Sequence, residues 1–171
     1  IAQRTLATEK NRLYVLDGRT PCDLHLFNIN NKGELDYLQN TSVCTDSDSC
    51  KMKVIDGKLY LAITDAFLVY DISNENDIKL ESSITDLKVK QNDLLITDKY
   101  AILACDDGVR VIDLMTMDIV THFFDGGKAM SIELDGNTLF VAVGYDGLEI
   151  LEANFDLGEE LSPCTDGLDL S

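Results

Sequence analysis

The sequence has no tryptophan, only two prolines and two histidines, and few basic residues. Its 171 residues include 31 acidic and 14 basic side chains, which gives a formal net charge of −17. A chain this negative repels phosphate backbones and anionic lipid, so roles at a nucleic acid or a membrane surface are disfavoured. A charged partner is therefore expected to be a basic protein or a metal cation. The acidity also has a simpler explanation, because a high net charge keeps a chain soluble.

Long apolar runs are also absent. No segment approaches the ~18 apolar residues that a membrane-spanning helix needs, and no signal-peptide pattern opens the chain. The sequence begins at Ile1 rather than Met, which fits a mature secreted protein or a fragment of a longer one, and Asn40-Thr41-Ser42 is a glycosylation sequon. An extracellular or periplasmic location is the expectation, and a cytoplasmic one stays open.

Signatures of catalysis are missing as well. The sequence has no Gly-rich phosphate loop, nucleophile elbow or paired-carboxylate motif. The two histidines, His25 and His122, fall in the middle of different predicted strands, and no pattern in the sequence brings them together as a catalytic dyad would require. No catalytic residue is predicted, and a non-enzymatic role is favoured.

What the sequence does contain is a repeat. Four apolar runs begin at Leu13, Leu59, Ala101 and Leu139, with spacings of 46, 42 and 38 residues. Each run is followed by a turn rich in Asp and Gly and then by a second run, which begins at Leu24, Phe67, Val109 and Leu148. Short β-branched and aromatic runs separated by turns predict an all-β fold, and a third strand is expected at 34–38, 78–84, 118–124 and 157–161. A period of about 40 residues favours a β-propeller over a sandwich.

The segments Asp107-Gly-Val-Arg-Val-Ile-Asp-Leu114 and Tyr145-Asp-Gly-Leu-Glu-Ile-Leu151 resemble the LVIVD-type propeller repeat, a relative of WD40 and YVTN blades. The resemblance covers nearly the whole chain and implies four blades, at about 4–48, 49–86, 87–125 and 126–166. The sequence departs from the WD40 pattern, since it has no Trp-Asp or Gly-His pair, and Ala66 stands where the turn Gly is expected. Blades of this kind occur in scaffolds, receptors and enzymes, so the resemblance implies a fold rather than an activity.

The sequence is compatible with both a closed propeller ring and an incomplete one. Residues 1–171 are expected to form one propeller domain or a piece of one, and 45% apolar residues suffice for a sizeable core. Arg4 to Glu9 is expected to be the innermost strand of the first blade, and Gly167 to Ser171 resembles that strand again. The chain is therefore either a closed four-bladed ring or part of a larger ring, completed by another segment or by a second copy.

Five cysteines fall toward one face of such a propeller, the face that carries the loops entering each blade. The chain has no Cys-x-x-Cys motif, so a zinc-ribbon site is not indicated. Loop disulfides are the favoured interpretation, with a Cys44–Cys50 bridge as the leading hypothesis and a buried Cys105. The disulfide candidates are Cys22, Cys44, Cys50 and Cys164.

The same face also gathers turn carboxylates. Calcium would find oxygen ligands there, although none of these segments has the EF-hand spacing, and solvated turn residues are the simpler interpretation. The predicted binding residues on this face are Asp17, Arg19, Asp46, Asp48, Asp65, Asp107 and Asp146.

The expected function is a non-enzymatic protein-binding or scaffold module that uses this acidic face, with no ligand or cofactor assigned. Its longest loops, Asp17 to Asp23 and Asn40 to Cys50, are the first candidates for contacting a partner. Two alternatives remain: a calcium-dependent propeller enzyme of lactonase-like type, and a structural part of a larger propeller.

Overall fold

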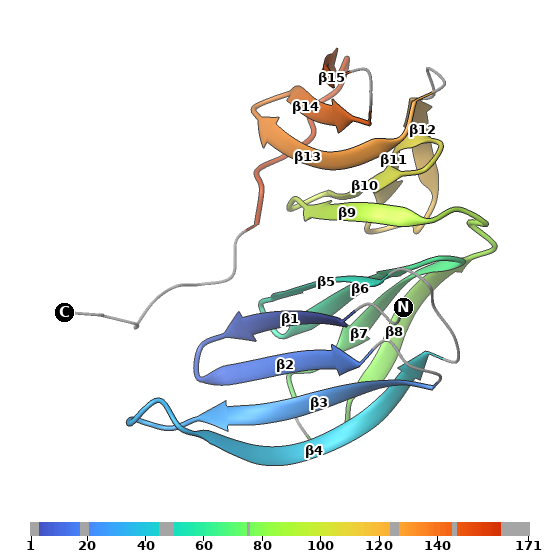
Figure 1. The fold of residues 1–171 in the computed structure, drawn as a ribbon. Coiled ribbons are helices and arrows are strands. Elements are labelled where there is room, and N and C mark those ends of the chain that lie inside the picture. Colours follow the sequence, from blue (N-terminus) through green and yellow to red (C-terminus); the bar gives the residue numbers. More distant parts are fainter. Residues whose placement is uncertain are drawn as a thin grey trace.

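A computed structural model describes residues 4–17, 21–44, 50–74, 76–123, 127–144 and 147–161. Within these ranges the chain forms fifteen β-strands and no helix, so no described helix could cross a membrane. The predicted all-β class is confirmed. The strands form four antiparallel sheets that follow one another along the sequence (Figure 1).

Strand order within each sheet follows the sequence. The first sheet contains β1 (Arg4–Glu9), β2 (Arg12–Asp17), β3 (Cys22–Ile29) and β4 (Leu35–Cys44). The second contains β5 (Cys50–Ile55), β6 (Lys58–Ile63), β7 (Ala66–Asp71) and β8 (Lys79–Thr85). The third contains β9 (Gln91–Ile96), β10 (Tyr100–Cys105), β11 (Gly108–Asp113) and β12 (Ile119–Phe123). The fourth contains β13 (Ala129–Asp135), β14 (Thr138–Val143) and β15 (Gly147–Glu152).

Tight hairpins join the first two strands of each sheet. Asp56 and Gly57 link β5 to β6 with φ of 50° and 73°, which is the type I′ geometry that matches the twist of paired strands. Glycine suits the second of these positions, because a positive φ strains any residue that has a Cβ. The short turn keeps β5 and β6 in register from Cys50↔Ile63 to Ile55↔Lys58.

Three apolar cores lie between the four sheets. Leu59 and Leu61 of β6 pack with β2 and β3 in the first core, whereas Tyr60 and Ala62 of the same strand face β10 in the second. The residues of β10 likewise divide between the second and third cores. Because β6 and β10 are covered on both faces, nearly all of their residues are buried, whereas buried and less buried residues alternate along β2 and β14.

The first strands of neighbouring sheets lie against one another, β1 on β5, β5 on β9 and β9 on β13. Among the described strands this row does not close into a ring, since β1–β4 and β13–β15 occupy its two ends (Figure 1). Four sheets in a row are therefore established. A propeller and its number of blades stay predictions.

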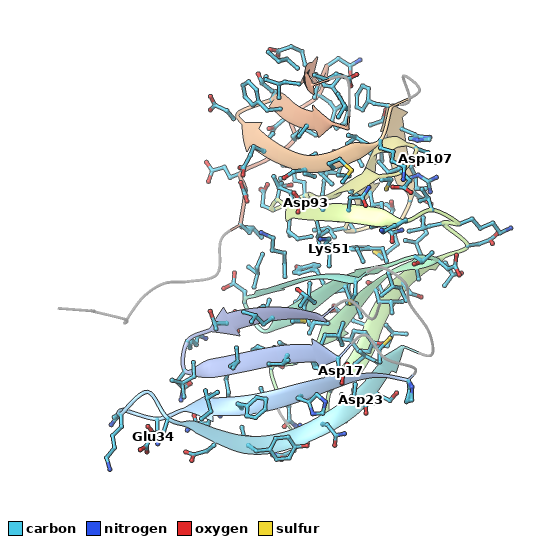
Figure 2. The ribbon with its side chains drawn as sticks, in the orientation of Figure 1. Asp17, Asp23, Glu34, Lys51, Asp93 and Asp107 are labelled. Carbon is cyan, nitrogen blue, oxygen red and sulfur yellow. The ribbon has the colours of Figure 1, made fainter. Side chains whose placement is uncertain are left out.

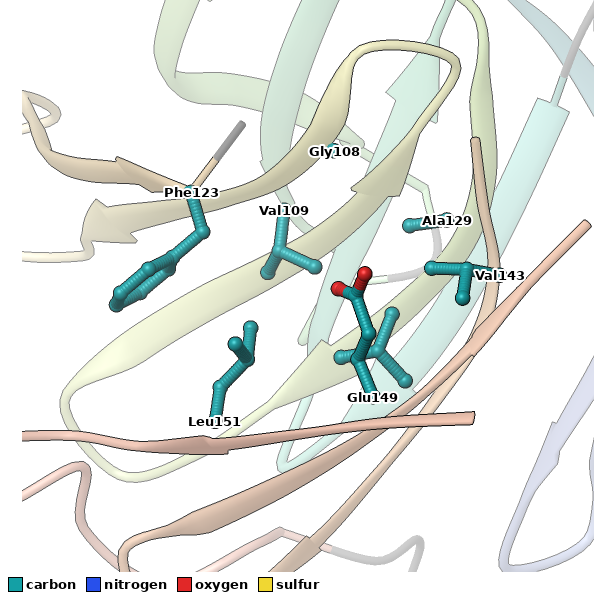
Figure 3. A pocket seen from close by; sticks show the side chains of 8 residues that line it. Gly108, Val109, Phe123, Ala129, Val143, Glu149 and Leu151 are labelled. Carbon is teal, nitrogen blue, oxygen red and sulfur yellow. The ribbon is translucent and has the colours of Figure 1, made fainter. Parts of the chain in front are cut away.

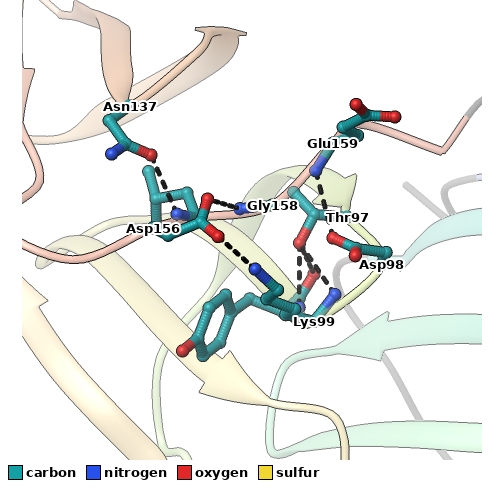
Figure 4. A network of polar contacts seen from close by, with 9 residues as sticks. Thr97, Asp98, Lys99, Asn137, Asp156, Gly158 and Glu159 are labelled. Carbon is teal, nitrogen blue, oxygen red and sulfur yellow. Dashed lines mark hydrogen bonds and ion pairs between the residues drawn. The ribbon is translucent and has the colours of Figure 1, made fainter.

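The segment after β15 departs from the expected pattern. Residues 157–161 do not form a third strand of the last repeat beside β15. Instead, the Leu161 amide donates to the Ile96 carbonyl at 2.8 Å, and Glu160 forms a bridge with Thr97 at the end of β9. Two side-chain acceptors hold this segment near the end of β9. The Leu157 amide donates to Asn137 Oδ1 at 2.9 Å, and the Glu159 amide donates to Asp98 Oδ1 at 3.0 Å (Figure 4). The predicted surplus strand, Gly167 to Ser171, lies outside the described residues.

Candidate functional site at the loop end

One end of the sheets, which we name the loop end, carries two kinds of connection. The turns between the second and third strands meet the segments that enter the next sheet. The Leu87 amide donates to the Asp65 carbonyl at 3.0 Å, and the Val89 amide donates to the Thr64 carbonyl at 3.2 Å. On its other side the same segment accepts a hydrogen bond at the Lys90 carbonyl from the Asp106 amide, at 3.0 Å. Backbone hydrogen bonds thus tie neighbouring sheets together at this end.

Three of the predicted binding residues lie at the loop end. Asp17 ends β2, Asp65 is exposed in the β6–β7 turn, and Asp107 lies in the β10–β11 turn. The other four predicted residues, Arg19, Asp46, Asp48 and Asp146, lie outside the described part of the chain. Figure 2 shows Asp17 and Asp107 on the same side of the row of sheets, with Glu34 on the opposite side.

Two carboxylates face each other in the first sheet. The β2–β3 register places Asp17 directly opposite Asp23, and Figure 2 shows the two side by side. Like charges at opposed positions of a strand pair repel each other and destabilise the pair.

The acids of the third sheet are engaged by the chain's own cations. Lys128 Nζ lies 2.7 Å from Asp106 Oδ2, and Asn92 donates to Asp106 Oδ1 at 2.9 Å. Partial burial works to raise the pKa of Asp106, but the hydrogen bonds from Lys128 and Asn92 outweigh it, so the pKa is lowered. Asp106 is therefore an internal ion-pair partner rather than an open ligand.

Asp107 is held by two residues that sequence reasoning did not select. Arg110 Nη2 lies 2.5 Å from Asp107 Oδ2, and Arg110 also donates to the Leu87 carbonyl at 3.0 Å. His122 Nε2 lies 2.8 Å from the Asp107 carbonyl oxygen and 3.6 Å from Oδ1. Arg110 and His122 are cross-strand partners on β11 and β12, so a correct strand register would have brought them together.

The two histidines lie in different sheets. His25 is on β3, with its ring centroid 6.4 Å from that of Tyr37, whereas His122 is on β12 beside Asp107. The structure therefore does not bring them together.

The cysteine hypothesis needs a correction. Cys50 carries a thiol, not half of a disulfide, so the predicted Cys44–Cys50 bridge is wrong. Cys50 is buried at the start of β5 in the first core, and burial raises its thiol pKa to about 12. Cys22 is disulfide-bonded, and the β3–β4 register places it opposite Cys44. The side chain of Cys44 and the whole of Cys164 lie outside the described residues.

Cys105 is fully buried in the second core, as predicted, and burial raises its thiol pKa to about 12. Across the described ranges, no three His, Cys, Asp or Glu side chains gather in a way that could hold a metal ion. Calcium binding at the loop end stays a prediction.

No protein-family model matches the chain, and no curated protein sequence matches it either.

Proposed function

We propose that the chain forms part of a β-propeller and serves as a non-enzymatic protein-binding or scaffold module. The propeller is supported by the repeated strand order and by the contacts between β1, β5, β9 and β13, which would line the propeller axis. The binding surface we propose is the loop end of the first two sheets.

One contrast carries the proposal. In the third sheet, Asp106 and Asp107 are matched by Lys128 and Arg110. In the first two sheets, by comparison, Asp65 is exposed and Asp23 is half-buried, and neither forms an ion pair with a described Lys or Arg. We name Asp23 and Asp65 the acidic patch. On a chain of net charge −17, such a patch attracts a basic partner and speeds its association.

The patch is tested with a fluorescein-labelled basic peptide of alternating Lys and Gly, followed by fluorescence anisotropy. We expect the double substitution Asp23→Asn and Asp65→Asn to weaken binding roughly five-fold, since exposed ion pairs contribute up to about 1 kcal/mol each. Raising the salt from about 0.05 to about 0.5 M should weaken binding further, because the Debye length shortens.

The matched control is the double substitution Asp36→Asn and Asp135→Asn. It removes the same charge from exposed positions at the opposite end of the strands. Equal loss of binding in the two double variants would show attraction to net charge alone and would contradict the proposed patch. Binding that salt leaves unchanged would contradict the electrostatic mechanism.

A further inference from the structure

Among the described residues, the fourth sheet has three strands, whereas each of the other three sheets has four. In those sheets β4, β8 and β12 pair antiparallel with the third strand, whereas no described strand pairs with the outer side of β15 (Figure 1). The segment that could have filled this place, residues 157–161, bonds to the end of β9 instead. One edge of β15 is therefore left open among the described residues.

The backbone groups on this edge follow from the register. The Ala153 amide donates to the Asn137 carbonyl at 3.0 Å, which makes this a hydrogen-bonded pair. Hydrogen-bonded pairs alternate along antiparallel strands, so Leu151 and Glu149 also bond to β14. The N–H and C=O groups of Leu148, Ile150 and Glu152 then point away from β14, toward the open edge.

The third sheet shows how such an edge is used. There the Asp113 amide, which takes the place of Glu152 in the repeat, donates to the Asp118 carbonyl at 2.9 Å, just before β12. The backbone groups on the open edge of β15 are therefore equivalent to the groups of β11 that bind β12 in the third sheet.

Apolar side chains lie on both faces of β15 beside the open edge. Leu148 and Ile150 are 62% and 59% exposed on the outer face. On the inner face Leu151 and Glu149 line a cavity between the third and fourth sheets, together with Val109 and Phe123 (Figure 3). The remaining residues that line it are Gly108, Ala129, Val141 and Val143. A strand added at this edge would place every second side chain beside the cavity.

Charge narrows the choice of partner. Glu149 is the one acid among the described residues that line the cavity, and Figure 3 shows its carboxylate surrounded by apolar side chains. Glu152 adds a second carboxylate at the end of the same strand. Because the chain has a net charge of −17, a strand from a second acidic copy would be repelled, whereas a basic one would be attracted.

We propose that the open edge of β15 binds an extended segment of a partner protein as an antiparallel fourth strand, with apolar side chains and a Lys or Arg opposite Glu149. Main-chain hydrogen bonds would supply affinity, and the cavity and Glu149 would supply specificity. This site is separate from the acidic patch, so either proposal can fail without the other.

Hydrogen exchange of the full chain, followed by NMR, tests the edge directly. In the chain alone we expect the amides of Leu148, Ile150 and Glu152 to exchange fast, and those of Glu149 and Leu151 to be protected by β14. Protection of all five in dilute protein would show that the chain covers its own edge, which overturns the proposal. Protection that grows with protein concentration, together with a dimer in light scattering, would identify a second copy as the occupant and would also overturn it.

The probe for binding is a labelled peptide, Lys-Val-Ile-Lys-Thr. In antiparallel register it places Val opposite Leu151, Ile opposite Ile150 and the second Lys opposite Glu149. We expect the peptide to protect the Leu148, Ile150 and Glu152 amides, and Glu149→Gln to weaken its binding roughly three-fold. An N-methyl group on the peptide's Ile removes a donor to β15 and should abolish binding. Equal binding of the methylated peptide would show that no strand is added.

The decisive variant is Ile150→Pro. Proline is tolerated on an edge strand whose N–H faces solvent, so the fold should survive while the edge loses a central donor. We expect peptide binding to fall at least about ten-fold. Ile150→Thr is the matched control, because it shortens the same side chain and keeps the N–H. If both variants bind the peptide alike, the side chain rather than the strand edge accounts for binding, and the proposal fails.

Discussion

Lys128 Nζ lies 2.7 Å from Asp106 Oδ2 and so joins the segment entering the fourth sheet to a turn of the third. Lys128 also contacts a turn of the fourth sheet itself, since the Gly144 amide between β14 and β15 donates to the Lys128 carbonyl at 3.2 Å. The ion pair therefore lies where the loop ends of two sheets meet.

The first prediction concerns this ion pair and pH. The pKa of Asp106 is lowered on folding, so its contribution to stability is present above the unfolded pKa of about 3.9 and is lost as the pH falls through the folded value. We expect Asp106→Asn to cost about 0.5 kcal/mol at pH 7 and nothing near pH 2, because the pair is partly exposed. Urea unfolding at both pH values measures this. A double-mutant cycle with Lys128→Gln is the control, and a coupling energy that persists at pH 2 would contradict the assignment.

The second prediction concerns the crossing segment after β15. Gly158 has φ of +80°, and a Cβ added there would lie 1.9 Å from Asp98 Oδ1, which accepts the Glu159 amide. We expect Gly158→Ala to lower the free energy of unfolding by about 2 kcal/mol, from backbone strain and a displaced acceptor.

Gly136→Ala is its matched control. Gly136 also has positive φ, at +59°, but an added Cβ meets nothing within 4 Å. We expect Gly136→Ala to lower the free energy of unfolding by about 1 kcal/mol, because only backbone strain contributes there. Equal costs for the two variants would show that the contact with Asp98 does not matter.

The third prediction concerns the cysteines. Paired cross-strand positions bring two Cα atoms to about 4.5–5.5 Å, within disulfide range, so we expect Cys22 to be bonded to Cys44. Peptide mapping by mass spectrometry without reduction should recover segments 22 and 44 joined. Recovery of Cys22 joined to Cys164 would contradict this expectation.

The fourth prediction concerns the two buried thiols. Because burial raises the thiol pKa of Cys50 and Cys105 to about 12, neither supplies much thiolate at pH 8. We expect iodoacetamide to label neither in the native protein and both in urea. Rapid native labelling of Cys105, which is fully buried, would show that the second core opens readily.

The fifth prediction concerns the cores. Leu103 of β10 is fully buried in the second core, and we expect Leu103→Ala to cost about 2–5 kcal/mol in chemical unfolding. Leu148→Ala removes the same atoms from a side chain that is 62% exposed and should change stability by less than about 0.5 kcal/mol. A cost above about 1 kcal/mol for Leu148→Ala would show that a further layer covers β15.

The strands could be predicted from sequence because their apolar runs are set by local burial. Leu59 to Ala62 and Ala101 to Ala104 are continuous runs, since each strand is packed on both faces. The position of the turn acids at one end could also be predicted, because a repeat puts equivalent turns on the same edge of each sheet. Asp17, Asp65 and Asp107 followed from that rule alone.

Other features depend on contacts between distant segments, which leave no local signal. The path of residues 157–161 is set by acceptors on Asn137 and Asp98, so an apolar pattern suggestive of a strand was misleading. Cys50 is close to Cys44 in the sequence, but it lies on β5 and packs in the first core, so it does not form the predicted disulfide. The Arg110–His122 pair required the exact register of β11 on β12.

The two-sided burial of β6 and β10 has a consequence for unfolding. Each middle sheet supports two cores, whereas the first and fourth sheets support one each, so stability resembles a sum of nearest-neighbour terms along a line. Partial unfolding should therefore begin at an end. The fourth sheet, with three described strands, is the weaker end, and its loss would leave Ile102 and Ala104 facing water, the first apolar surface available for aggregation.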